Sequence, residues 1–103
     1  MNRFRDETAE ICKQKGWDKA PISAVWMLYT EESGELASAI RQHQRIYKKT
    51  GLKKDRGVDI KMEMGDVFSY LFQLASMLDV DLDEMWLKHQ MKILDKNYNM
   101  HNT

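Results

Sequence analysis

The chain has 103 residues, a length typical of one domain, and its 16 basic and 16 acidic residues give a formal charge of zero. This balance gives no indication of a surface for nucleic-acid polymers or for membranes. A single cysteine, Cys12, excludes an internal disulfide and suits a reducing compartment. Because no apolar run is long enough for a membrane span or a signal peptide, we expect a cytoplasmic protein with one domain, residues 1–103.

Apolar spacing and scarce turn residues predict an all-α chain with four helices. In chain order, the helices are expected at about residues 3–15, 21–46, 59–78 and from 81 onward. Gly16 is placed to end the first helix, and Pro21 suits the first turn of the second. Asp81, with Glu84 three residues later, forms a capping-box pattern at the start of the fourth. A basic connection, residues 48–56, separates the second helix from the third.

Two acidic motifs occur on the central helices, Glu31-Glu32-Ser33-Gly34-Glu35 and Glu63-Met64-Gly65-Asp66. Glu32 and Glu35 are three residues apart, as are Glu63 and Asp66, so each pair shares one helix face. Apolar residues continue both faces, which are therefore expected to be buried. Several carboxylates in a core cost several kcal/mol per ion unless they are compensated. The sequence therefore predicts a metal site.

Gly34 and Gly65 stand at the same place in the two motifs, one residue before the second acid. Glycine inside a helix costs about 0.5–1 kcal/mol relative to alanine. The repeated position predicts that the two helices approach each other closely there and bring the four acids together.

The acids and their spacing resemble the EExxE…ExxD signature of the MazG-like family of all-α nucleoside triphosphate pyrophosphohydrolases. The resemblance extends roughly from Trp17 to Asn97. It implies a four-helix bundle assembled as a dimer or a dimer of dimers. It also implies Mg²⁺-dependent hydrolysis of a (deoxy)nucleoside triphosphate to the monophosphate and pyrophosphate.

An all-oxygen ligand set suits hard cations such as Mg²⁺ or Mn²⁺. The resemblance implies that Glu32, Glu35, Glu63 and Asp66 bind one or two such ions. The metal would offset the repulsion between these acids and a triphosphate and would orient the attacking water. Glu31, beside the cluster, is the candidate catalytic residue that orients or deprotonates this water, and the alternative is an ordinary surface glutamate.

Two aromatic residues are candidates for contacts with the nucleoside. Trp17, in the turn before the first motif helix, resembles the position that stacks on the base in the family, although a core or interface role is as good an explanation. Tyr70 lies one turn beyond Asp66 on the same face and either contacts the sugar or caps the core.

Lys92, Lys96 and Asn97 resemble the Lys/Asn cluster that holds the phosphates in relatives, although solvated lysines are common on a last helix. Many relatives have an arginine after this asparagine, and this chain has none nearby. Phosphate neutralisation is therefore expected to depend more on the basic connection, residues 48–56, or on a neighbouring subunit. The connection is equally well explained as a linker.

Large apolar residues occur on more than one face of the predicted helices: Trp26, Met27, Phe68, Phe72, Met77 and Trp86. Surplus apolar faces usually close as subunit interfaces, so we expect at least a homodimer. The alternative is that these residues complete the core of one chain.

Two other classes of protein fit parts of the pattern. A ferritin-like di-iron protein would need Glu-x-x-His motifs, and here Glu35 and Asp66 occupy the fourth position instead. A non-catalytic helical module that binds a nucleotide or metal would be expected to have lost some of the acids. The sequence therefore predicts a pyrophosphohydrolase with a house-cleaning or pool-control activity, and leaves open the base, the number of metal ions and the choice between dimer and tetramer.

Overall fold

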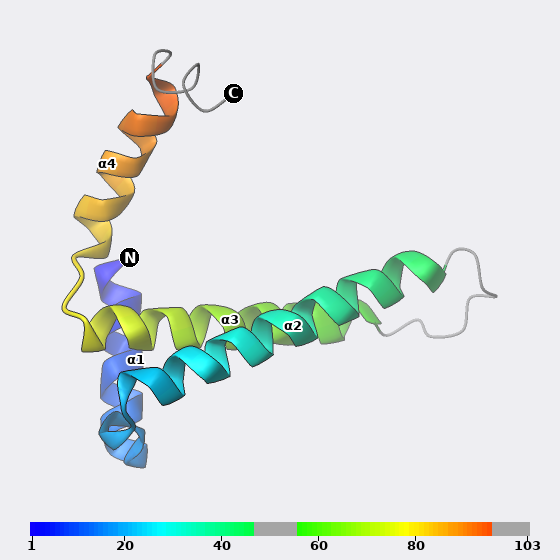
Figure 1. Ribbon diagram of the computed structural model, residues 1–103, viewed down its shortest axis with the longest axis horizontal. Helices are drawn as coiled ribbons and strands as arrows, with labels where there is room; N and C mark the ends of the chain where they lie inside the picture. Colours follow the sequence, from blue (N-terminus) through cyan, green and yellow to red (C-terminus); the bar gives the residue numbers. More distant parts are fainter. Residues whose placement is uncertain (47–55, 96–103) are drawn as a thin grey trace.

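The computed structural model describes residues 1–46 and 56–95, and these residues form helices without any strand. The elements are α1 (Asn2–Lys15), the 3₁₀ turn η1 (Trp17–Lys19), α2 (Ile22–Ile46), α3 (Arg56–Met77) and α4 (Leu82–Leu94) (Figure 1). The prediction of an all-α chain with four helices is confirmed. Lys96, Asn97 and residues 48–55 of the basic connection lie outside the described residues. Arg56, predicted in the connection, instead begins α3, so this helix starts about one turn earlier than predicted.

The predicted helix ends follow from local chemistry. Gly16 ends α1 with a φ of 78°, in the left-handed region that glycine adopts without strain, and its N–H donates to the carbonyls of Cys12 and Lys13. Asp81 caps α4, since its carboxylate accepts the backbone N–H of Glu84 at 2.9 Å. The predicted end of the first helix at Gly16 and the predicted start of the fourth at Asp81 are confirmed.

The antiparallel helices α2 and α3 pack along each other, and α1 crosses α3 near its carboxyl end (Figure 1). Apolar residues of these helices and of the first turn of α4 form the small core. The buried apolar side chains are Cys12, Val25, Ala39, Leu74, Ala75 and Leu82. The α2–α3 pair therefore forms the body of the molecule.

The first turns of α1 and α4 cap each other. The Asn2 side-chain oxygen accepts the N–H of Leu82 at 2.7 Å, and its amide donates to Asp81 at 3.0 Å. In return, the Asp83 carboxylate accepts the backbone N–H of Asn2 at 3.2 Å. A backbone hydrogen bond from Glu84, followed by the bond from Asn2, lowers the pKa of Asp81. These contacts hold the start of α4 against α1.

Beyond this anchor, α4 extends away from the α2–α3 pair (Figure 1). Its apolar side chains stay uncovered within one chain, with Leu87 59%, Met91 63% and Leu94 78% exposed. The four helices therefore do not close around one common core in a single chain. Among the described helices, none combines the length and apolar character needed to cross a bilayer.

Candidate functional site

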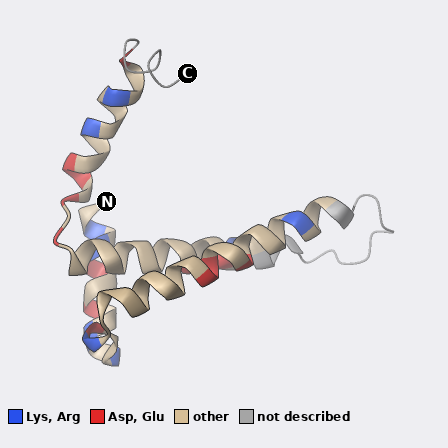
Figure 2. Ribbon diagram, in the orientation of Figure 1, with Lys and Arg blue, Asp and Glu red and all other residues tan. Residues whose placement is uncertain are grey.

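Glu32 of α2 and Glu63 and Asp66 of α3 meet where the two helices face each other. One carboxylate oxygen of each residue lies within 4.8 Å of the others. Figure 2 shows the acidic residues of α2 and α3 along the facing middle parts of the two helices. Three of the four predicted ligands thus gather at one point, which we call the acid cluster.

Burial makes these carboxylates costly. Glu32 and Glu63 are half-buried, and the Oε1 atom of each is buried without a hydrogen-bond partner among the described residues. A buried polar atom without a partner loses its hydration and gains nothing in return. Asp66 is exposed and opens the cluster to solvent on one side. An oxygen-only cluster of this kind fits the ligand preference of Mg²⁺ or Mn²⁺.

The raised pKa of Glu32 also fits a cation site. Burial raises the pKa of Glu32 from 4.5 to about 7, and the negative charges of Glu35, Asp66 and Glu63 add to the shift. The proton also allows a hydrogen bond between the Glu32 and Glu63 side chains, which the two ionised carboxylates cannot form. Glu32 is therefore only partly ionised near neutral pH, and a bound cation would compete with its proton. A bound divalent cation would supply the missing positive charge.

Glu35 and Glu31 lie beside the cluster and are exposed. Glu35 is outside the group of three that meets within 4.8 Å, although its charge acts on Glu32. Burial raises the pKa of Tyr70, and the charges of Glu32, Asp66 and Glu31 add to this effect. The charge of Glu35 therefore acts on the cluster, and the charge of Glu31 acts on the neighbouring Tyr70.

The prediction that Gly34 and Gly65 mark a close approach of the two motif helices is wrong. A Cβ atom added at Gly34 or at Gly65 would meet no atom within 4 Å, so neither glycine marks a close approach of the helices. Each glycine directly precedes an acid, and successive residues are rotated by about 100° around a helix. Both glycines are exposed, and nothing in the described residues explains them.

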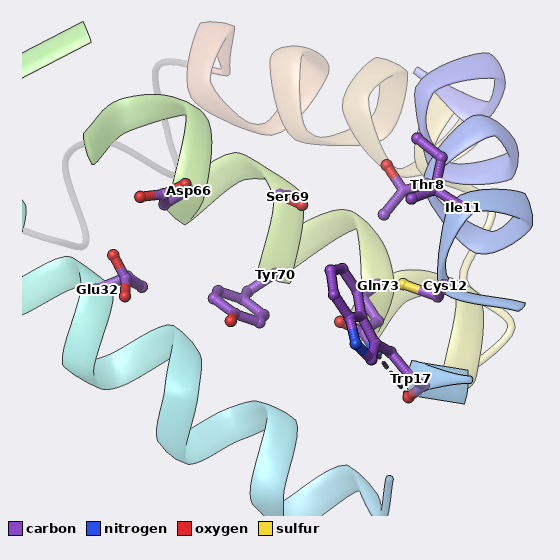
Figure 3. Close-up of a pocket in the computed structure, with 9 residues that line it drawn as sticks. All are labelled: Thr8, Ile11, Cys12, Trp17, Glu32, Asp66, Ser69, Tyr70 and Gln73. Carbon is purple, nitrogen blue, oxygen red and sulfur yellow. Dashed lines mark hydrogen bonds between the residues drawn. The ribbon is translucent and has the colours of Figure 1, made fainter. Parts of the chain in front are cut away.

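A cavity of about 300 Å³ opens beside the acid cluster and continues toward α1 and η1 (Figure 3). Glu32 and Asp66 stand at one end, and Trp17 stands at the other with Tyr70 between them (Figure 3). The lining residues are Thr8, Ile11, Cys12, Trp17, Glu32, Asp66, Ser69, Tyr70 and Gln73. Both predicted aromatic residues therefore line a cavity that adjoins the predicted metal ligands.

The model of the MazG nucleotide pyrophosphohydrolase domain matches residues 22–101. The chain belongs to the MazG family. It is also similar to YvdC of Bacillus subtilis (strain 168), an uncharacterized protein, with 33% identity over 89 residues that cover 82% of this chain and 83% of that one. No solved structure is significantly similar. The MazG match contains both acidic motifs, and it begins after Trp17.

Lys92 is the one predicted phosphate contact of this MazG chain that the structure describes, and it does not line the cavity. It lies in the last turn of α4, which extends away from the α2–α3 pair (Figure 1). Within one chain, the acid cluster and Lys92 are therefore separate.

Sequence analysis missed the wall of the cavity that Cys12 and Gln73 form. Gln73 follows Asp66 by seven residues, two helical turns, so it shares the face of Asp66 and Tyr70. A glutamine two turns beyond Asp66, on the part of this face expected to be buried, was a signal that could have been found. Cys12 and Trp17 approach this face only because α1 crosses α3, which the sequence pattern did not predict.

Proposed function

We propose that this MazG chain is a Mg²⁺-dependent pyrophosphohydrolase that converts a nucleoside triphosphate to the monophosphate and pyrophosphate. The observation that carries the proposal is the acid cluster, in which three carboxylates from facing helices meet within 4.8 Å beside a cavity. Its two buried oxygens without hydrogen-bond partners support a bound cation. Membership of a family named for this activity supports the reaction class.

In this proposal Glu32, Glu63 and Asp66 hold the metal, and Glu35 completes the set from the next turn of α2. When bound, Mg²⁺ would offset the negative charge of the triphosphate and activate the water that attacks the α-phosphorus. Glu31 lies at the exposed edge of the site, where it would accept the proton of this water. In this arrangement the carboxylates of the acid cluster would determine where the cation binds.

The nucleoside is proposed to occupy the cavity. The ring of Trp17 stacks on the base, and Tyr70 contacts the sugar from the middle of the cavity (Figure 3). This arrangement directs the triphosphate toward the acid cluster. The substrate class is a (deoxy)nucleoside triphosphate, and the biological role is house-cleaning or control of nucleotide pools.

We further infer that a second copy of the chain covers α4. An apolar groove of about 310 Å³ between α3 and α4 stays open in one chain, lined by Met1, Phe68, Leu71, Phe72, Leu82, Met85, Trp86 and His89. The exposed apolar side chains of α4 continue this surface. In a homodimer, or a dimer of dimers, Lys92, Lys96 and Asn97 of one subunit would contact the phosphates in the other.

The test is turnover of a panel of nucleoside and deoxynucleoside triphosphates, common and modified, in Mg²⁺, with pyrophosphate and orthophosphate measured separately. We expect pyrophosphate and monophosphate in equal amounts, no product in a chelator, and recovery when Mg²⁺ or Mn²⁺ is restored. Release of orthophosphate alone would mean that a different bond is cut. No turnover of any nucleotide would contradict the proposal and favour a non-catalytic binding module.

A further inference from the structure

Gln73 is the only buried polar or charged residue among those that the structure describes, with 6% of its surface exposed. Glutamine is usually found at the surface, so a glutamine buried this deeply is informative. It lies on α3 in the wall of the cavity, at the end away from the acid cluster (Figure 3). The mechanism proposed above gives it no role.

One hydrogen bond fixes the direction of the Gln73 amide. Its Nε2 atom donates to the backbone carbonyl of Trp17 at 3.4 Å (Figure 3). A carbonyl oxygen can only accept, so the nitrogen must face Trp17, and Oε1 and the second N–H are left for another partner. The described residues offer this side chain no other hydrogen bond, and 3.4 Å is long for an N–H···O bond. The Trp17 carbonyl therefore orients the Gln73 amide, whose Oε1 atom and second N–H make no hydrogen bond to the described residues.

The position along α3 fits a nucleoside whose phosphates reach the acid cluster. Asp66, Tyr70 and Gln73 follow one another on one helix face, and seven residues correspond to roughly 10 Å along the axis. This is the scale of the span from the innermost phosphate of a nucleotide to the far edge of its base. Gln73 and the Trp17 ring line the same end of the cavity (Figure 3), so a base that stacks on this ring would have its edge near the amide.

We propose that Gln73 selects the base of the substrate. Its Oε1 atom accepts a hydrogen bond from an amino or imino group of the base, and its second N–H donates to the neighbouring acceptor. Carboxamides pair with adjacent donor and acceptor positions of a base in this two-bond manner. The ligand class is a nucleobase with a free hydrogen-bonding edge, and the inference rests on the proposed function because it places the phosphates at the acid cluster.

The test compares the unaltered chain with Gln73→Met, which keeps the size of the side chain and removes both polar groups. We expect kcat/KM for the preferred base to fall roughly 10- to 100-fold, mainly through KM, because a two-bond contact has been lost. Turnover of disfavoured bases should change little, so the preference among bases should be largely lost. An equal loss on every base would overturn the proposal and leave Gln73 as a support for η1.

Gln42→Leu is the matched control. Gln42 is partly buried on α2, also makes a 3.4 Å hydrogen bond, to Ser38, and does not line the cavity. Its replacement should leave the order of preference among bases unchanged. A change as large as that from Gln73→Met would contradict a specific role for Gln73.

A second measurement covers the cases in which Gln73→Met does not fold or no triphosphate is hydrolysed. Binding of each common nucleoside, without phosphates or metal, is measured by calorimetry, and the nucleoside that binds most tightly is compared with the same nucleoside methylated on its base-pairing edge. We expect the methylated nucleoside to bind at least about 10-fold more weakly, because it cannot pair with the amide. Equal binding of the two would overturn the role of Gln73. Absence of turnover with normal discrimination would instead overturn only the proposed function.

Discussion

The middle of the α2–α3 pair and the length of α4 have opposite mismatches between chemistry and burial. In the α2–α3 pair, Glu32 and Glu63 have buried carboxylate oxygens without hydrogen-bond partners. In α4, Leu87 and Leu94 are 59% and 78% exposed. One region buries charge, and the other exposes apolar surface.

The two regions are also held in place differently. Apolar side chains such as Val25 and Leu74 pack the α2–α3 pair, and the repulsion within the acid cluster opposes this packing. Polar contacts of Asn2 with Asp81 and Leu82 hold only the beginning of α4. Under the proposed function, a cation would compensate the acid cluster and a second copy of the chain would cover α4.

The largest expected effect comes from removing one charge from the acid cluster. Asp66→Asn should lower turnover by more than about 100-fold, the upper range for loss of a group that only supports a metal ligand. The metal-free variant should melt no lower than the unaltered chain, because the repulsion on Glu32 decreases. Steady-state kinetics and thermal melts in chelator measure both effects.

Glu10→Gln provides the control for Asp66→Asn. Glu10 is exposed on α1, and its carboxylate accepts a hydrogen bond from Gln14 outside the cluster. Its replacement should leave turnover within a factor of about two, because surface changes of this kind are nearly neutral. Near-normal turnover of Asp66→Asn would show that the ligand assignment is wrong.

The next largest effect is on stability, and it compares a buried leucine of α3 with an exposed leucine of α4. Leu74 is 6% exposed in the α2–α3 core, so Leu74→Ala should lower the free energy of unfolding by about 2–5 kcal/mol. Leu87 is 59% exposed, so Leu87→Ala should cost less than about 0.5 kcal/mol in a single chain. Urea unfolding at low and high protein concentration compares the two substitutions.

Concentration dependence decides whether a second copy covers α4. We expect the cost of Leu87→Ala to increase at concentrations where the chain is dimeric, because assembly then buries this side chain. Sedimentation of both variants gives the oligomeric state directly. If Leu87→Ala were neutral at every concentration and the chain sedimented as a monomer, the proposed interface would be refuted.

A smaller effect is expected in how the stability of the metal-free chain depends on pH. The pKa of Glu32 is raised from 4.5 to about 7 in the folded chain, so the folded state binds this proton more tightly than the unfolded state does. Its contribution to stability is complete below pH 4.5 and disappears as the pH rises through about 7. The metal-free chain should therefore be less stable at pH 8 than at pH 5.

Mg²⁺ should reverse this trend, because the cation replaces the proton on Glu32. At about 100 times its dissociation constant, a ligand specific to the folded state adds about 2.7 kcal/mol of stability. We expect this gain at pH 8 and a smaller one at pH 6. Thermal melts in chelator and in Mg²⁺ at the two pH values test it, and an equal gain at both would contradict competition with the proton.

The smallest expected effect tests the anchor of α4. Asn2→Ala removes the side-chain oxygen that accepts the N–H of Leu82, which should cost about 0.5–2 kcal/mol as for other helix caps. Hydrogen exchange should become faster in the first turn of α4 and stay unchanged in the middle of α3. Equal acceleration in both helices would mean that the cap supports the whole fold.

Features that depend on neighbouring residues could be predicted from the sequence. The helices follow from apolar spacing, the end of α1 follows from Gly16, and the cap of α4 follows from Asp81. The pairing of acids within each motif follows from helical periodicity. These features need only the backbone geometry of one helix, which a short stretch of residues determines.

Contacts between helices could not be predicted from the local sequence patterns. The sequence suggested that Gly34 and Gly65 mark a close approach, and the structure leaves both in open space. It did not indicate that Gln73 would meet the Trp17 carbonyl, or that α4 would extend away from the α2–α3 pair. Periodicity says which residues share a face, but the loops, the caps and the packing of several chain segments decide which faces meet.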